Sequence, residues 1–201
     1  MASSQTTVPG WPDVLLQPVA EVAPALLGAH LTHAGVTVRL TEVEAYDGPN
    51  DPASHAYRGM TARTAVMFGP PGRLYVYFSY GMHWCANVVC GRDGRASAVL
   101  LRAGEVVDGI QIARERRGGR RDVELARGPA NLCQALGIQR HQDGLDLTHH
   151  LTLGASPVPP ERIARGPRVG ISVAHDVEWR FWVEGDPTVS SYKRSPRAPK
   201  V

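Results

Sequence analysis

The chain has 201 residues, a formal net charge of +3 at pH 7 and 43% hydrophobic residues. This length suits one domain with a sizeable core, and the mild excess of basic residues permits an anionic partner such as nucleic acid without requiring one. Three cysteines without a CxxC pair argue against a disulfide framework, and no apolar run approaches the 18 residues of a membrane span. We therefore expect a cytoplasmic protein with reduced thiols and no membrane segment.

The first third of the chain predicts an arm, a helix, a hairpin and a long loop. Residues 1–18 are expected to form a loose N-terminal arm, followed by a helix over 19–27 that Pro24 interrupts and Gly28 ends. Strand-like runs at 29–33 and 36–46 flank Ala34-Gly35, which is a hairpin signal. Residues 47–72 lack periodicity, and a loop of this length in a compact domain indicates a function.

The remainder of the chain predicts a meander and two further helices. Strands are expected at 74–80, 81–90 and 96–103, then helices at 105–117 and 127–138, where Pro129 suits a first turn and Gly137 a helix end. Short strands follow at 169–173 and 179–185, before a flexible tail at 192–201. We predict an α+β fold: a single domain over 19–191 with a curved, largely antiparallel sheet flanked by helices.

Two acidic residues stand in the predicted strand 36–46. Alternation places Glu42, Glu44 and Tyr46 on the same face as the apolar residues at 36, 38 and 40. A buried carboxylate needs a partner or a chemical role. The alternatives are that both acids pair with arginines such as Arg39 or Arg102, or that the strand leaves the core and the acids are solvated.

Other features allow more than one interpretation. His55 is a lone loop histidine with no second ligand at metal spacing, so no metal site is expected. The tyrosines of the run 74–80 either fill a sheet face or form a platform that stacks nucleobases. The arginine-rich run 114–121 is either a solvated helix end or a phosphate contact.

Four stretches in chain order resemble a known family. They read EVEAYDGPNDPASHAYRG at 42–59, TARTAVMFGPPGRLYVYFSYGMHWCANVV at 61–89, VLLRA at 99–103 and GPANLCQALGI at 128–138. Over roughly residues 25–190 the chain resembles the alkyladenine (3-methyladenine) DNA glycosylases, whose eukaryotic-type fold has bacterial members. The resemblance implies an enzyme that flips damaged purines out of duplex DNA and hydrolyses their N-glycosidic bond, which initiates base excision repair.

The resemblance also implies roles for residues of the reaction centre and of the base pocket. Glu44 matches the catalytic carboxylate that deprotonates the attacking water, and Arg102 matches a residue near that water and a backbone phosphate. Glu42 is expected to support the site by pairing with an arginine. The residues expected to form the base pocket are Tyr46, His55, Tyr77 and Asn87, of which Asn87 would reject the amino group of guanine.

Further residues are expected to contact DNA. Tyr80 matches the wedge that fills the space left by the flipped nucleotide, and Met82 lies beside it in the chain. Thr61 and Arg63 fall where the family braces the duplex.

Two lysines, Lys193 and Lys200, lie in the tail, and the other 20 of the 22 basic residues are arginines. A bifunctional glycosylase needs an amine to form a Schiff base, so we expect a monofunctional enzyme without a cofactor. We further expect a monomer that is nucleoid-associated when bound to damaged duplex DNA and that acts on alkylated or deaminated purines. The alternatives are a non-catalytic nucleic-acid-binding module and a hydrolase of free nucleosides.

Overall fold

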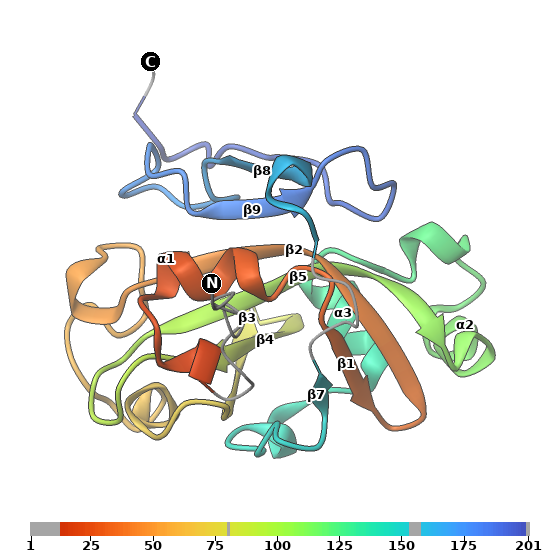
Figure 1. Ribbon diagram of the computed structural model, residues 1–201, viewed down its shortest axis with the longest axis horizontal. Helices are drawn as coiled ribbons and strands as arrows, with labels where there is room; N and C mark the ends of the chain where they lie inside the picture. Colours follow the sequence, from red (N-terminus) through yellow and green to blue (C-terminus); the bar gives the residue numbers. More distant parts are fainter. Residues whose placement is uncertain (1–12, 80, 153–157, 200–201) are drawn as a thin grey trace, which may run out of the picture.

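The computed structural model describes residues 13–79, 81–152 and 158–199, and these ranges contain three α-helices and nine β-strands (Figure 1). The helices are α1 (Val19–Ala25), α2 (Ile110–Arg117) and α3 (Pro129–Leu136). The strands are β1 (His30–His33), β2 (Val36–Tyr46), β3 (Leu74–Ser79), β4 (His83–Val89), β5 (Ala98–Asp108), β6 (Ala126–Arg127), β7 (Leu151–Thr152), β8 (Ile163–Gly166) and β9 (Arg180–Val183). No described helix is long and apolar enough to cross a membrane.

One open antiparallel sheet organises the fold, which confirms the predicted α+β class. The main strand order is β3-β4-β5-β2-β1-β7, while β6 pairs with β5 and the β8–β9 hairpin joins through β9. Strand β2 is central: β5 pairs along one edge, and β1 and then β9 pair along the other. Figure 1 shows β8 and β9 lying above β2. The C-terminal half of β2 is therefore enclosed from both sides.

The two faces of strands β3 to β5 have different roles. One face is apolar and joins α1 and α3 in the hydrophobic core; its members are Leu74, Val76, Ala86, Val88, Val99 and Leu101. The alternate residues point to the opposite face, as the two-residue period of a strand requires. These are Tyr75, Tyr77, Cys85, Asn87, Leu100 and Arg102. The second face is thus the polar and aromatic one.

A β-bulge in β2 corrects the prediction that Glu42 and Glu44 continue the core face. Leu40 pairs with Gly104 but Glu42 pairs with Ala103, so β2 carries one extra residue, Thr41. An extra residue shifts the alternation by one position. Val36, Val38 and Leu40 join the core before the bulge, and Val43 and Ala45 join it afterwards. The two acids consequently point away from the core.

The hairpin prediction is confirmed, because Ala34 and Gly35 adopt positive φ angles of 46° and 78° between β1 and β2. The helix predicted at 105–117 begins only at Ile110. Residues 105, 106 and 108 instead extend β5, where they pair with β2, and sheet pairing overrides the helical spacing.

The strand predicted at 169–173 is wrong, because this segment is irregular. Its backbone N–H groups do not pair with a neighbouring strand. Val169 N–H donates to the Glu44 side chain, and Gly170 N–H donates to the Lys193 carbonyl at 2.9 Å. Gly170 also has a φ of 73°, which interrupts an extended run.

The long loop 47–72 is compact and contains two 3₁₀ turns, Gly48–Asn50 and Ala65–Phe68. Gly48 has a φ of 50°, and a Cβ there would stand 2.0 Å from the carbonyl oxygen of Ala96. Only glycine allows the loop to pack this closely on the turn before β5. The loop is thereby held against the sheet, over its polar and aromatic face.

Candidate active site

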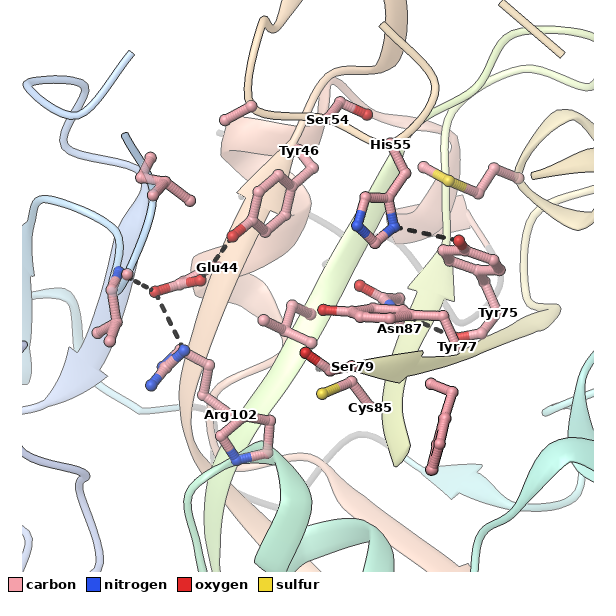
Figure 2. Close-up of a pocket in the computed structure, with 18 of the residues that line it drawn as sticks. Glu44, Tyr46, Ser54, His55, Tyr75, Tyr77, Ser79, Cys85, Asn87 and Arg102 are labelled. Atoms are coloured by element: carbon pink, nitrogen blue, oxygen red, sulfur yellow. Dashed lines mark hydrogen bonds and ion pairs between the residues drawn. The ribbon is translucent and has the colours of Figure 1, made fainter. Parts of the chain in front are cut away.

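A cavity of about 550 Å³ lies on the polar and aromatic face of the sheet. Strands β2, β3, β4 and β5 form its floor, while residues of the loop 47–72 and residues 169–171 form its sides. Figure 2 shows Tyr46, His55 and Tyr77 around one open space, with Glu44 at its edge. A cavity of this size accommodates a small organic ligand.

The sheet register explains how distant residues meet on this floor. Tyr75 pairs with Asn87, Asn87 with Leu100, and Leu100 with Glu44, so four residues form one row across β3, β4, β5 and β2. Neighbouring strands lie about 4.8 Å apart, which fixes the spacing of the row. The aromatic end and the acidic end of the cavity are therefore set by backbone pairing.

Glu44 is fully buried, accepts two hydrogen bonds and forms one ion pair. Its Oε2 accepts a hydrogen bond from the Tyr46 hydroxyl at 2.8 Å, and its Oε1 accepts one from Val169 N–H at 2.7 Å. The Nη1 atom of Arg102 lies 3.5 Å from Oε1. Burial, and then the charge of Glu44, raise the pKa of Tyr46 well above its ordinary value, so its hydroxyl remains a donor.

Glu42 is the centre of a second buried network, which shares Arg102 with Glu44. Its Oε1 accepts from Nε of Arg102 at 3.0 Å and from Nε of Arg180 at 2.6 Å, and its Oε2 accepts from Ser190 N–H at 2.8 Å. Burial alone would raise the pKa of Glu42, but the two arginines and the Ser190 hydrogen bond outweigh it, and the net pKa is lowered. This is the arginine pairing that the sequence predicts, with Arg180 as a further partner. Arg102 lies between the two carboxylates.

Aromatic rings line the other end of the cavity. The His55 ring meets the Tyr77 ring edge-on, with centroids 4.5 Å apart, and Tyr75 stacks on Tyr77 at 5.7 Å. Nδ1 of His55 and the Tyr75 hydroxyl are 3.1 Å apart. Burial and the nearby charge of Arg63 lower the pKa of His55 to about 4. His55 is thus neutral at neutral pH.

Arg63 and Asn87 also border the cavity. The Arg63 guanidinium lies 5.5 Å from the centroid of the Tyr77 ring, although its side chain is exposed. The buried Asn87 donates from Nδ2 to the Tyr75 carbonyl at 3.1 Å, which fixes the orientation of its amide.

Seven of the ten predicted site residues line this cavity: Glu44, Tyr46, His55, Arg63, Tyr77, Asn87 and Arg102. Two others do not. Thr61 bonds to Thr64 within its own turn, and Met82 is 67% exposed in the turn between β3 and β4. Tyr80 lies outside the described residues.

The arginine-rich run 114–121 largely serves the structure at the end of α2. Arg114 pairs with Asp122 and Arg121 with Glu124, at 2.8 and 2.6 Å. Arg116 donates to the carbonyls of Ala34 and Ala135, which ties α2 to neighbouring segments. These contacts favour the interpretation of this run as a structural helix end.

The sequence does not predict that Val169, Arg168 and Asp51 lie next to the site, because their partners are far away along the chain. Val169 reaches Glu44 across 125 positions, and Arg168 reaches Asp51 across 117. Asp51 stands within the family-like stretch 42–59, which is the one local signal available. Within the described parts of the chain, no three His, Cys, Asp or Glu residues gather as a metal site.

A buried carboxylate beside an aromatic cavity is the arrangement expected of a hydrolase that cleaves a glycosidic bond next to a planar base. The comparison with known families agrees. Residues 13–187 match the methylpurine-DNA glycosylase family, and the chain belongs to this family. It is therefore a hydrolase of N-glycosyl bonds, of the DNA-3-methyladenine glycosylase type, that acts on DNA with alkylated bases.

Bacterial relatives support this assignment over the whole chain. The chain is 54% identical to a protein of Streptomyces avermitilis, with 92% of each chain covered, and 51% identical to one of Frankia casuarinae over the full length of both. A protein of Nocardia farcinica is 56% identical over 87% of each chain. All three carry the name "Putative 3-methyladenine DNA glycosylase".

Proposed function

We propose that this enzyme flips alkylated or deaminated purines out of duplex DNA into the cavity and excises them by hydrolysis, with Glu44 as general base. The observation that carries the proposal is the position of Glu44, a fully buried carboxylate at the edge of an aromatic cavity. A buried carboxylate needs partners or a chemical role, and Glu44, besides its partners, faces this cavity.

In the proposed reaction, Glu44 takes a proton from a water molecule as that water attacks C1′ of the deoxyribose. The C1′–N bond breaks and its electron pair leaves with the purine. The transition state resembles an oxocarbenium ion, which the negative carboxylate stabilises. Tyr46 and Val169 fix the two carboxylate oxygens, and Arg102, itself held by Glu42, lies beside them.

Tyr46, His55 and Tyr77 form the base site in this proposal. Stacking on aromatic side chains contributes about 1 to 3 kcal/mol per base, and a π-rich wall favours cationic N-alkylated purines. Asn87 is held rigidly in the floor by Tyr75, so it offers a fixed obstacle to the 2-amino group of guanine.

The same proposal assigns DNA contacts around the cavity. Tyr80 is the wedge that replaces the flipped nucleotide, Met82 is exposed beside it in the chain, and Thr61 braces the duplex. Arg63 lies over the Tyr77 ring, where a base would stack. We therefore expect Arg63 to move to a backbone phosphate when a base enters.

We also infer a monofunctional mechanism, which leaves an abasic site with an intact strand. This inference rests on the small number of amines, because the chain has two lysines. The structure describes one of them, Lys193, whose backbone carbonyl accepts a hydrogen bond from Gly170 at the cavity wall. An experiment must therefore test whether the Lys193 side chain forms a Schiff base. We also predict that the enzyme acts as a monomer, and that it acts in the cytoplasm at the nucleoid.

The test is single-turnover excision from matched duplexes that contain a 3-methyladenine analogue, hypoxanthine, etheno-adenine or undamaged adenine. Strand breaks should appear only after alkali and only with a lesion. Borohydride should trap no covalent complex, either with the natural chain or with Lys193→Ala. Tight lesion binding without breaks after alkali would refute the proposal, and borohydride trapping that Lys193→Ala abolishes would refute the monofunctional mechanism.

A further inference from the structure

Arg168 is a fully buried arginine that joins segments distant in the chain. It lies between β8 and β9 and is 1% exposed. Its two Nη atoms donate to the two carboxylate oxygens of Asp51, and Nη1 also donates to the Ala45 carbonyl at 2.9 Å. The guanidinium carbon lies 4.6 Å from the Tyr46 ring centroid and 5.5 Å from that of Trp179.

The Asp51 side of this contact supports the base pocket. Oδ1 of Asp51 accepts a hydrogen bond from Ala53 N–H at 3.0 Å, and its backbone carbonyl accepts one from Ser54 N–H at 2.8 Å. These bonds form the turn that presents His55 to the cavity. By holding the Asp51 carboxylate in two places, Arg168 fixes where this turn stands relative to β2.

The other contacts of Arg168 support the carboxylate. Tyr46, whose ring packs on the guanidinium, donates its hydroxyl to Glu44 Oε2. Val169 follows Arg168 directly in the chain and donates its N–H to Glu44 Oε1. Both hydrogen-bond donors to Glu44 therefore depend on where the Arg168 side chain and backbone lie.

Stability alone is a poor explanation for this arrangement. Removing two charges from water is expensive, and a buried ion pair is often no more stabilising than apolar side chains of similar volume. The planar fork of arginine, however, permits simultaneous two-point bonding and ring stacking, which lysine cannot reproduce. The contacts specify position more than they add stability.

We propose that Arg168 is a positioning residue for base excision, which holds Tyr46 and Val169 on Glu44 and, through Asp51, holds His55 in the base pocket. This inference rests on the proposed function, because it assumes that Glu44 and the aromatic cavity act together. It adds a residue that touches neither the base nor the sugar.

Three variants test it: Arg168→Lys, which keeps the charge; the pair Arg168→Met with Asp51→Asn, which removes both charges; and the control Arg39→Lys. In the pair, the side-chain amide that replaces the Asp51 carboxylate retains an oxygen for the Ala53 N–H. Arg39 lies on the same strand as Glu44 and bridges Glu105 and Asp186, but it does not line the cavity.

The first readout is the single-turnover rate set against the affinity for lesion-containing DNA. We expect both Arg168 variants to excise about 100-fold more slowly, the loss typical of a misplaced catalytic group, with less than about threefold weaker binding. The double variant should keep a denaturation midpoint near that of the natural chain. Arg39→Lys should leave the rate unchanged.

The second readout is hydrogen exchange, which needs no turnover. The amides of Val169 and Ser54 should lose protection in both Arg168 variants, while amides in the β3–β4 pair should keep theirs. A double variant with rates within threefold of the natural chain would overturn the proposal, and so would unchanged protection at Val169 and Ser54. If the natural chain excised no lesion, the proposed function would fail by itself, and the exchange data would still decide whether Arg168 positions these segments.

Discussion

Replacing Glu42 by glutamine should destabilise the fold strongly, although the side chain keeps its size. Glu42 is fully buried and accepts hydrogen bonds from Arg102, Arg180 and Ser190. Glutamine offers one acceptor oxygen in place of two, so its amide nitrogen must face one of these donors. Both buried guanidinium groups would also lose a counter-charge.

The expected loss follows from this geometry. Removing one partner of a buried ion pair costs about 3 to 5 kcal/mol, because the remaining charge stays buried. For a domain of 150 to 250 residues, each 1 kcal/mol shifts the melting temperature by about 2 to 4 °C, so Glu42→Gln should lower it by roughly 6 to 20 °C.

The effect should depend on pH in a defined direction. The pKa of Glu42 is lowered in the folded state, so its contribution to stability is present above the ordinary value of 4.5 and is lost as the pH falls below it. The difference between the natural chain and Glu42→Gln should therefore be full at neutral pH and shrink in acid.

Urea denaturation at pH 7.5 and at pH 4 measures both effects. Glu105→Gln is the matched control, because Glu105 pairs with Arg39 at 2.8 Å but its side chain is 50% exposed. An exposed pair contributes about 0 to 1 kcal/mol, so this control should change little. A loss below 1 kcal/mol for Glu42→Gln, or an equal loss in both variants, would refute the reasoning.

Four further predictions concern the cavity and the proposed wedge. Tyr46→Phe should slow excision about 10- to 100-fold in single-turnover assays, because a hydrogen bond to a charged group such as Glu44 contributes about 1.5 to 3 kcal/mol; an unchanged rate would show that this bond is dispensable. By NMR, His55 should titrate near pH 4, and Arg63→Ala should raise its pKa because a nearby positive charge is removed; a midpoint that stays the same would contradict the position of Arg63. Since the folded-state pKa of His55 lies below its ordinary 6.5, the folded protein should lose stability as the pH falls from about 6.5 towards 4. Tyr80→Ser should weaken flipping of etheno-adenine, followed by its fluorescence, and unchanged flipping would argue against the wedge.

The predictable parts of this structure are the local ones. The Ala34-Gly35 hairpin and helix α3, from Pro129 to the stop at Gly137, follow from turn and cap chemistry within a few residues. The first residues of the helix expected at 105–117 belong to β5 instead. They pair with β2, and local sequence carries no information about pairing with a distant strand.

The direction of Glu44 shows the limit most clearly. Strict alternation assigned this residue to the face of Leu40, and a single extra residue at Thr41 reversed the assignment. Bulges depend on the register of two strands far apart in sequence, so β2 alone does not reveal one. The family resemblance assigns a catalytic role to Glu44 independently of this direction, because motif similarity requires no knowledge of register.

The backbone donor to Glu44 and its neighbour in the chain are equally hidden. Val169 begins the irregular segment 169–173, which spacing alone predicts as a strand, and Arg168 directly precedes it. Their partners, Glu44 and Asp51, stand more than 100 positions away. Only the folded chain brings them together.

The most direct test of the central claim is the single-turnover rate of Glu44→Gln on a duplex with one etheno-adenine or hypoxanthine, measured together with lesion affinity. Loss of a general base that also stabilises charge should slow excision by about 1,000-fold or more. Affinity should change less than threefold, and the Glu105→Gln control should excise normally. An excision rate for Glu44→Gln within tenfold of the natural chain would contradict the account, because Glu44 would then be a structural acid and the base would have to be sought elsewhere in the cavity.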